Sequence, residues 1–177
     1  PGPLYPQLVA ESIIVTSSAV VRRTAALEAG GFREDFSCKA GVEDWEFFLR
    51  LCRRGEYVHL PSLLIDYRVH PGSAIQTERS GLRRDALRVL DLQEGVPAWT
   101  DALRALGRAR VHFDSGVRHL AAGDRAQARR DFGASLSHPR FRARSLALGA
   151  LTFFPASATS ALRRLRRGWC RAASIEG

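Results

Sequence analysis

The stretch from Glu28 to Ser73 constrains the fold of this chain more than any other part of the sequence. It contains, in order, a Gly-Gly-Phe turn, a Glu-Asp pair followed by an apolar run, and a Tyr-Arg-Val-His element. Paired glycines can end a helix, because glycine readily adopts the left-handed conformation found after helix C-termini. Acidic residues favour the start of a helix, where the helix dipole is positive. The order therefore predicts a short helix, a sharp turn, a second helix and then strands.

Hydrophobic patterning predicts a mixture of helix and strand before Arg79 and helix alone after it. Residues Ser12–Val21 are apolar and rich in β-branched side chains, which predicts a buried strand. Residues 56–70 predict two short strands interrupted by a proline. Between these segments we expect helices over Thr24–Ala29 and residues 42–55, the second with an apolar face formed by Trp45, Phe48, Leu49 and Cys52.

This order of motifs resembles the C-terminal half of the catalytic domain of glycosyltransferase family 2, over residues 11–76. Members of that family are inverting nucleotide-sugar transferases of GT-A fold. The resemblance implies an α/β fold for residues 1–78, a partial GT-A domain whose N-terminal nucleotide-binding half is missing. An all-α region would follow over residues 79–177.

Val42-Glu43-Asp44 resembles the xED motif of this family. The residue matching Asp44 is the general base that deprotonates the acceptor hydroxyl in the family. Inverting transfer needs one such carboxylate opposite the leaving diphosphate, close enough to take the proton during attack. Glu43 would either orient the acceptor or cap the helix. Without these neighbours, the helix dipole alone would explain the acidic pair.

The residues Gly30, Gly31 and Phe32 resemble the family's glycine loop, whose bare backbone lets the donor sugar and diphosphate approach closely. Trp45 follows the base, and it would either stack on an acceptor sugar or pack in the core. Arg68 belongs to the Tyr-Arg-Val-His element. It would contact a phosphate or form an ion pair at a sheet edge.

His70 matches the family's C-terminal histidine, which in many GT-A enzymes meets the divalent metal or the diphosphate. The resemblance therefore implies Mg²⁺ or Mn²⁺ as cofactor. However, the sequence contains no DxD carboxylate pair, and no alternation of strands and helices precedes Ser12. Such metals rely mainly on oxygen ligands. Together with the lack of methionine, this suggests a fragment that is inactive alone, and its exposed sheet edge predicts dimerisation or aggregation.

Charge is distributed unevenly along the chain. Residues 1–97 carry 12 Lys+Arg against 13 Asp+Glu, whereas residues 98–177 carry 15 against 5. Residues 109–139 resemble one tetratricopeptide-like hairpin, but a generic helical hairpin is the favoured interpretation. The arginine-rich segment 161–174 would form an amphipathic helix that either binds an anionic membrane surface or is simply solvated. Nucleic acid is disfavoured, because no nucleic-acid-binding motif is present.

The three cysteines are an odd number without CxxC spacing, which argues against disulfides or a zinc site and favours a reducing compartment. We therefore expect a cytoplasmic protein, either free or at the inner face of the membrane. The predicted function is part of a metal-dependent inverting glycosyltransferase. It would move a sugar from a nucleotide-diphosphate donor to a hydroxyl acceptor in glycan or polysaccharide biosynthesis. The rival hypothesis is a non-catalytic helical adaptor that binds a partner or membrane.

Overall fold

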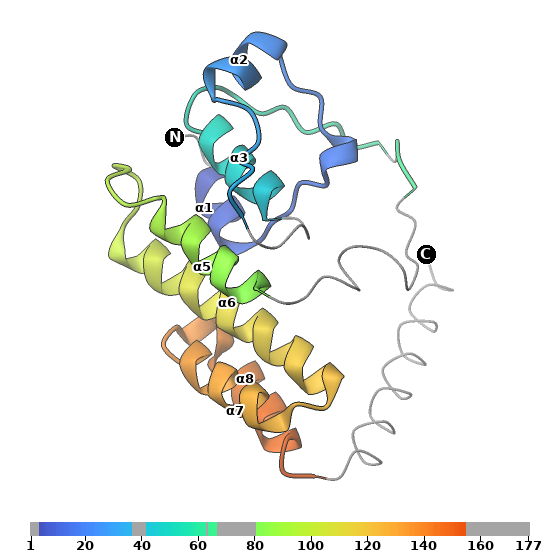
Figure 1. Cartoon of the computed structure of the whole chain (residues 1–177), viewed down its shortest axis with the longest axis vertical. Coiled ribbons are helices and arrows are strands. Elements are labelled where there is room, and N and C mark those ends of the chain that lie inside the picture. The colour runs from blue at the N-terminus through green and yellow to red at the C-terminus, as the bar shows by residue number, and fades with distance from the viewer. Residues whose placement is uncertain (1–3, 37–41, 63, 67–80, 155–177) are drawn as a thin grey trace. The chain divides into compact units, whose positions relative to one another are not determined.

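The computed structural model describes residues 4–36, 42–62, 64–66 and 81–154. The chain divides into two compact units, Pro1–Val111 and His112–Gly177 (Figure 1). Its regular elements are α1 (Leu4–Ala10), a short 3₁₀ turn η1 (Thr16–Ser18), α2 (Arg23–Glu28), α3 (Glu43–Leu51), α5 (Leu82–Asp91), α6 (Asp101–Ala122), α7 (Arg125–Ser135) and α8 (Pro139–Leu151).

The predicted α/β fold is wrong for the described part of the chain, which contains helices and no strand. Residues 12–21, expected to form a buried strand, are irregular chain interrupted by η1, and Val20 is fully exposed. Residues 56–62 and 64–66 are also irregular, and Val58 is 84% exposed. A strand needs a neighbouring strand to pair its backbone N–H and C=O groups. Apolar, β-branched composition alone does not supply that neighbour.

The core of the first unit forms around α3, whose apolar face is buried as the sequence predicts. Its buried side chains include Trp45, Phe48 and Leu49, each at most 3% exposed. Helices α1 and α5 contribute to the same cluster, with Tyr5, Leu8, Val9, Val89 and Leu90. Burying one large apolar side chain stabilises a fold by roughly 1.5–3 kcal/mol. The cluster therefore holds α3, the helix that begins with Glu43 and Asp44, firmly in this unit.

Helix α5 lies beside the first part of α6 (Figure 1). Gly107 permits this close approach, because a Cβ atom there would lie 2.9 Å from a methyl carbon of Leu90. Arg108 forms an ion pair with Asp91 at 2.5 Å on the surface of the same helix pair. Helix α5 thus belongs to the first unit, although the sequence groups it with the helical region that starts at residue 79. The units divide after Val111, within α6; the predicted boundary between family domain and appendage stays a prediction.

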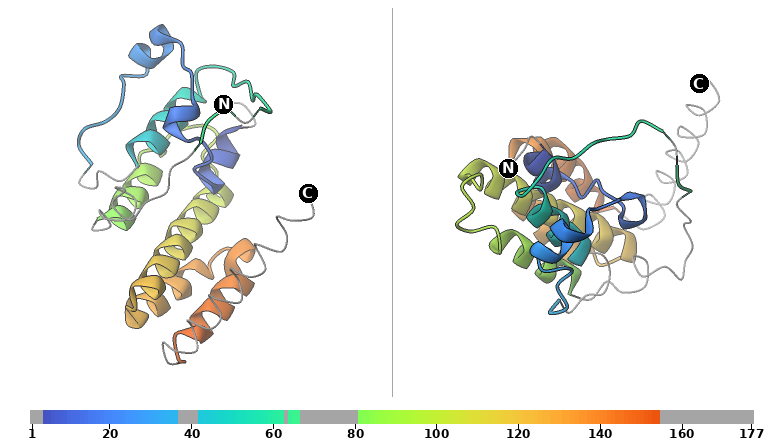
Figure 2. Two further views of the ribbon diagram at one scale, coloured as in Figure 1. Left: turned by 90° about the vertical axis from the view of Figure 1, so that its right-hand side faces the viewer. Right: turned by 90° about the horizontal axis from the view of Figure 1, so that it is seen from above.

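The second unit contains α7, α8 and the last part of α6, and Figure 2 shows α7 and α8 side by side. Gly123, with φ of 87°, and Asp124 form the turn between α6 and α7 at the position that the sequence predicts. The Asp124 carboxylate accepts the Gln127 backbone N–H at 3.0 Å and so caps α7. The Phe132 ring packs against Gly116, where a Cβ would lie 2.7 Å from a ring carbon. Whether the hairpin is a tetratricopeptide unit stays a prediction.

A buried carboxylate also joins α6 to α7 in the second unit. Asp131 is 1% exposed, and it accepts the Ser115 hydroxyl at 2.8 Å. The Nδ1 atom of His119 lies 2.7 Å from the same carboxylate oxygen.

Within the described ranges, no helix is both long enough and apolar enough to cross a bilayer.

Candidate functional site

Asp44 is the second residue of α3, and both of its carboxylate oxygens have a hydrogen-bond donor. Its Oδ1 accepts the Trp45 backbone N–H at 2.6 Å, and its Oδ2 accepts the Thr16 hydroxyl at 2.9 Å. Thr16 comes from η1, 28 residues earlier in the chain. Each carboxylate oxygen has two lone pairs, so each can accept a further hydrogen bond. The carboxylate is therefore oriented by the protein but still able to accept a proton.

The surroundings of Asp44 raise the proton affinity of its carboxylate. Burial raises the pKa of Asp44, and the nearby negative charge of Glu43 adds to this rise. The hydrogen bonds from Thr16 and from the Trp45 N–H act in the opposite direction, because they stabilise the ionised carboxylate. The net effect is a raised pKa on an oriented carboxylate, and a general base gains proton affinity from such a shift.

Glu43 opens α3 but does not cap it. The N-cap position is Val42, and no side-chain cap bond is made there. Glu43 is partly buried, and its Oε2 atom is buried without a hydrogen-bond partner among the described residues. A buried carboxylate oxygen without a donor is unfavourable in free energy. Glu43 therefore does not occupy the capping position, and its other predicted role, orienting an acceptor, stays a prediction.

The Gly30-Gly31 pair forms the predicted turn after α2. Both residues have positive φ, 84° and 65°, which side-chain-bearing residues rarely adopt. The Gly30 N–H donates to Leu27 O at 2.9 Å and the Gly31 N–H donates to Ala26 O at 3.0 Å. Phe32 is 47% exposed, and its ring centroid lies 4.4 Å from that of Phe47. The glycine N–H groups thus close the helix, while the space beside Gly31 is open.

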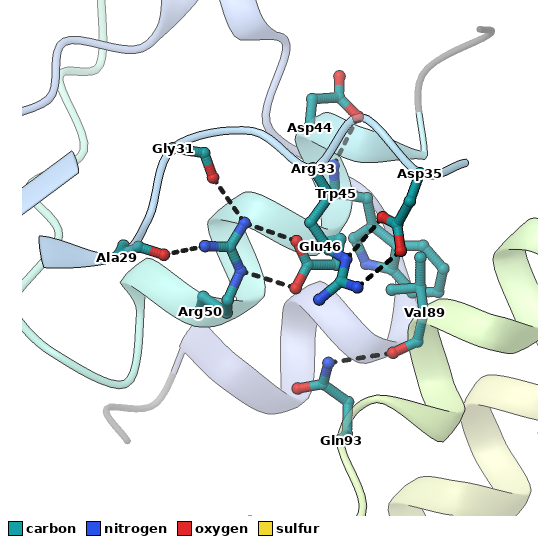
Figure 3. A network of polar contacts seen from close by, with 10 residues as sticks. All are labelled: Ala29, Gly31, Arg33, Asp35, Asp44, Trp45, Glu46, Arg50, Val89 and Gln93. Carbon is teal, nitrogen blue, oxygen red and sulfur yellow. Dashed lines mark hydrogen bonds and ion pairs between the residues drawn. The ribbon is translucent and has the colours of Figure 1, made fainter. Parts of the chain in front are cut away.

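Arg50, near the end of α3, holds this turn in place (Figure 3). Its guanidinium donates to the carbonyl oxygens of Ala29 and Gly31, the second at 2.7 Å. It also forms a two-point ion pair with Glu46, with both N···O distances at 2.7 Å. Glu46 is 2% exposed, so the pair lies largely inside the protein. One helix therefore carries Asp44 at its start and fastens the glycine turn near its end, with the two positions about 9 Å apart along the axis.

Trp45 lies in the core in this structure. It is 3% exposed, and its indole Nε1 donates to Leu8 O in α1 at 2.7 Å. The Arg110 guanidinium carbon lies 4.8 Å from the centre of the Trp45 rings. The structure thus shows the packing alternative, and contact with an acceptor sugar stays a prediction.

The loop after Phe32 is fixed by two arginines. Arg33 forms a two-point pair with Asp35, and Arg88 of α5 binds the same carboxylate and the Asp35 backbone carbonyl. The Arg33 hydrogen bonds, aided by Arg88, hold the pKa of Asp35 well below its usual range. Asp35 therefore stays ionised and links the loop to α5.

The predicted contacts of Arg68 and His70 lie outside the described residues. Among the described residues, no group of three or more histidine, cysteine, aspartate or glutamate side chains is placed to hold a metal ion. The described part of the chain therefore does not by itself fit the Mg²⁺ or Mn²⁺ that the resemblance implies.

The sequence does not mark Arg50 and Thr16 as functional residues of this site. The Glu46–Arg50 pair has a recognisable signal, since glutamate four residues before arginine on a helix favours an ion pair. The role of Arg50 at the glycine turn has no such signal, because the carbonyl groups that it binds, those of Gly31 and Ala29, lie 19 and 21 residues earlier in the chain. Thr16 was hidden for another reason: the segment around it has the composition of a strand.

The comparisons with known proteins place one family on this region. A family model described as "Glycosyltransferase like family 2" matches residues 4–93. The match begins at α1 and ends just after α5, so it extends beyond the motifs between residues 11 and 76. No curated protein and no solved structure matches the chain.

Proposed function

Because the chain belongs to glycosyltransferase-like family 2, we propose that it carries the acceptor-activating part of a sugar transferase, with Asp44 as the general base. The observation that supports this most directly is the environment of Asp44. A half-buried carboxylate with a raised pKa has one fixed donor on each oxygen. A general base needs this combination of orientation and proton affinity.

The proposed reaction is inverting transfer from a nucleotide-diphosphate sugar to a hydroxyl of a glycan or polysaccharide acceptor. The acceptor oxygen attacks the anomeric carbon and forms the new C–O bond. Asp44 takes the proton of that hydroxyl, and the electron pair of the breaking C–O bond leaves with the diphosphate. Glu43, whose Oε2 is buried without a partner among the described residues, is proposed to orient the acceptor. No second carboxylic acid is needed, because a diphosphate is already a good leaving group.

On the donor side, we propose that the Gly30-Gly31-Phe32 turn lines the sugar. Both glycine N–H groups already bind helix carbonyls, so donor recognition would use the open space beside Gly31 and the exposed Phe32 ring. Arg50 would keep the turn at a constant position relative to the base helix. Arg68 is proposed to meet a phosphate, and Trp45 to support the acceptor side from the core.

A requirement for Mg²⁺ or Mn²⁺ is also part of the proposal, and it rests on the family and on His70. The described residues do not provide a set of metal ligands, so no step above depends on a metal ion. If the cation is required, removal by EDTA should abolish transfer and added Mn²⁺ should restore it. Transfer that continues unchanged in EDTA would contradict this part.

The proposal is tested with the complete gene product that contains this chain. The measurement is release of nucleoside diphosphate from a panel of UDP- and GDP-sugars, with and without hydroxyl acceptors. Removing a general base lowers turnover by about 10²- to 10⁴-fold, so Asp44→Asn should do the same. The control is Asp124→Asn, which changes an aspartate at a helix N-terminus in the second unit, where asparagine caps equally well. Full activity of Asp44→Asn would overturn the proposal.

One observation favours the rival class, a non-catalytic adaptor. The regular elements among the described residues are all helices, and none is a strand of the kind a nucleotide-binding sheet requires. An adaptor predicts that the wild-type protein releases no nucleoside diphosphate from any donor in the panel. It also predicts that Asp44→Asn leaves binding to a partner unchanged.

A further inference from the structure

The Thr16 hydroxyl lies within hydrogen-bonding distance of the Asp44 carboxylate. It donates to Asp44 Oδ2 at 2.9 Å, although 28 residues separate the two in sequence. The other carboxylate oxygen is bound by a backbone N–H of the same helix. Thr16 is therefore the described side chain that fixes the carboxylate from outside α3.

The position of Thr16 is set by the core of the first unit. Trp45, the neighbour of Asp44, donates from its indole to Leu8 O at 2.7 Å. Two hydrogen bonds thus join adjacent residues of α3 to Leu8 and Thr16, which are eight positions apart. The segment from Leu8 to Thr16 is therefore hydrogen-bonded at both ends to the start of α3. Because Leu8 is 1% exposed and Trp45 is 3% exposed, one end of this loop is anchored in the core.

The turn η1 directs Thr16 toward α3. The Ser18 N–H and the Ser18 hydroxyl both donate to Val15 O, at 2.8 and 2.7 Å, and the Ala19 N–H donates to Thr16 O at 3.2 Å. These bonds tighten the backbone around Thr16 without using its hydroxyl. The Thr16 proton remains available for Asp44.

We infer that Thr16 is a positioning residue, which holds the Asp44 carboxylate in one orientation for proton abstraction from the acceptor hydroxyl. This inference rests on the proposed function of Asp44 as base. A threonine hydroxyl has a single proton, and here Asp44 Oδ2 accepts it. The second lone pair on Oδ2 stays free for the acceptor proton, and Thr16 itself neither gains nor loses a proton in the reaction.

The charged groups around Asp44 define what the loss of this bond should do. Glu43 is the charged neighbour on the same helix and raises the pKa of Asp44 together with burial. From η1, Thr16 supplies a neutral donor, whereas the Leu8 backbone carbonyl of α1 accepts from the Trp45 indole and not from Asp44. A donor that stabilises the ionised form lowers the pKa. Its removal should therefore move the titration of Asp44 to higher pH.

The test is the pH titration of the Asp44 side-chain carboxyl carbon by NMR, with four variants. Thr16→Val removes the hydroxyl and keeps the shape, and Thr16→Ser keeps the hydroxyl. Ser18→Ala removes a neighbouring hydroxyl of the same turn, while the Ser18 backbone N–H keeps its bond to Val15 O and Asp44 is not touched. We expect the midpoint to move to higher pH in Thr16→Val and to stay near that of the wild type in Thr16→Ser and Ser18→Ala. Thr16 is exposed, so the substitutions should fold, and Thr16→Ala serves as a second variant without the hydroxyl.

A midpoint unchanged in both Thr16→Val and Thr16→Ala would overturn the inference, as would an equal shift in Ser18→Ala. The second readout is transfer by the complete gene product, where Thr16→Val should lower kcat about tenfold with little change in KM. Unchanged kcat with a shifted midpoint would also overturn the positioning role. The proposed function fails separately, through activity of Asp44→Asn, whatever the Thr16 titrations show.

Discussion

At the scale of single residues, the charge on Asp44 has a consequence for stability. Burial raises its pKa in the folded state above the ordinary value of about 3.9. Between these two pKa values the folded state binds more protons than the unfolded state, so stability falls as pH rises through this window. Asp44→Asn removes the charge. We expect the variant to unfold at a higher temperature than the wild type at pH 7.

Thermal unfolding at pH 7 and at pH 3 checks this sign. At pH 3 the wild-type carboxyl is protonated in both states, so the difference in Tm should disappear. Asp124→Asn replaces one good N-cap by another, so its Tm should match that of the wild type at both pH values. A lower Tm for Asp44→Asn at pH 7 would show that its charge stabilises the fold.

Cys52 offers a second prediction at this scale. Its side chain is 2% exposed, and burial raises the pKa of the thiol to about 11. At pH 8 only about one molecule in a thousand carries the reactive thiolate. In a Cys38→Ser/Cys170→Ser variant, we therefore expect no reaction with a disulfide reagent until urea unfolds the first unit. Rapid modification of the native protein would contradict the packing of α3.

At the scale of elements, Arg50, paired with Glu46, should be the main side chain that joins α3 to the glycine turn. Removing one member of a buried ion pair leaves the other charged and unpaired, which typically lowers stability by about 3–5 kcal/mol. Because Arg50 is 17% exposed, Arg50→Met should lower the free energy of unfolding in urea by about 3 kcal/mol. The control, Arg54→Met, changes an exposed arginine one turn later and should stay within about 0.5 kcal/mol of the wild type.

In the second unit, two glycines test the packing of α6 on α7. A methyl group at Gly116 would meet the Phe132 ring at 2.7 Å, whereas one at Gly133 would meet nothing within 4 Å. Gly116→Ala should therefore destabilise the unit by about 1–3 kcal/mol. Gly133→Ala should stabilise it by up to about 1 kcal/mol through helix propensity. Urea unfolding of both variants decides the matter, and equal stability would place the Phe132 ring elsewhere.

Helices α2 and α3 could be predicted from sequence because their signals are local. The apolar spacing of α3 and the Gly30-Gly31 stop are contained within one or two turns of chain, and both are found in the structure. The strands could not be predicted in the same way, because a strand exists only if a second segment pairs with it. The region around Thr16 has strand composition, but here it forms a 3₁₀ turn that contacts Asp44.

Residues of the candidate site likewise differ in whether their sequence signal is local. Asp44, Glu43 and the glycines are recognisable because their types and order are local properties of one stretch. Thr16 and Arg50 act across 28 and about 20 residues of intervening chain, and only the packed structure brings these partners together.

At the scale of the whole molecule, the dominant feature is charge. Residues 98–177 carry 15 basic and 5 acidic side chains, whereas residues 1–97 are close to neutral. The segment 161–174, which lies outside the described residues, places four arginines around Leu162 and Leu165 in the sequence. We expect it to bind anionic membranes, since each arginine near such a surface contributes about 1 kcal/mol.

Co-sedimentation with vesicles tests this prediction against its alternatives. The wild-type protein should bind vesicles that contain phosphatidylserine, bind phosphatidylcholine alone weakly, and lose binding as salt increases, because salt screens exposed charges. Replacing the four arginines at positions 163, 164, 166 and 167 with glutamine removes about 4 kcal/mol of attraction, or about a thousandfold in affinity. The matched control replaces four exposed arginines of the second unit, Arg130, Arg140, Arg142 and Arg144, with glutamine. If the segment itself binds the membrane, the control retains most of the affinity, because its lost charges do not flank the apolar strip. Equal losses in the two variants would mean that net charge alone drives binding, and no binding by the wild type would mean that the segment is simply solvated.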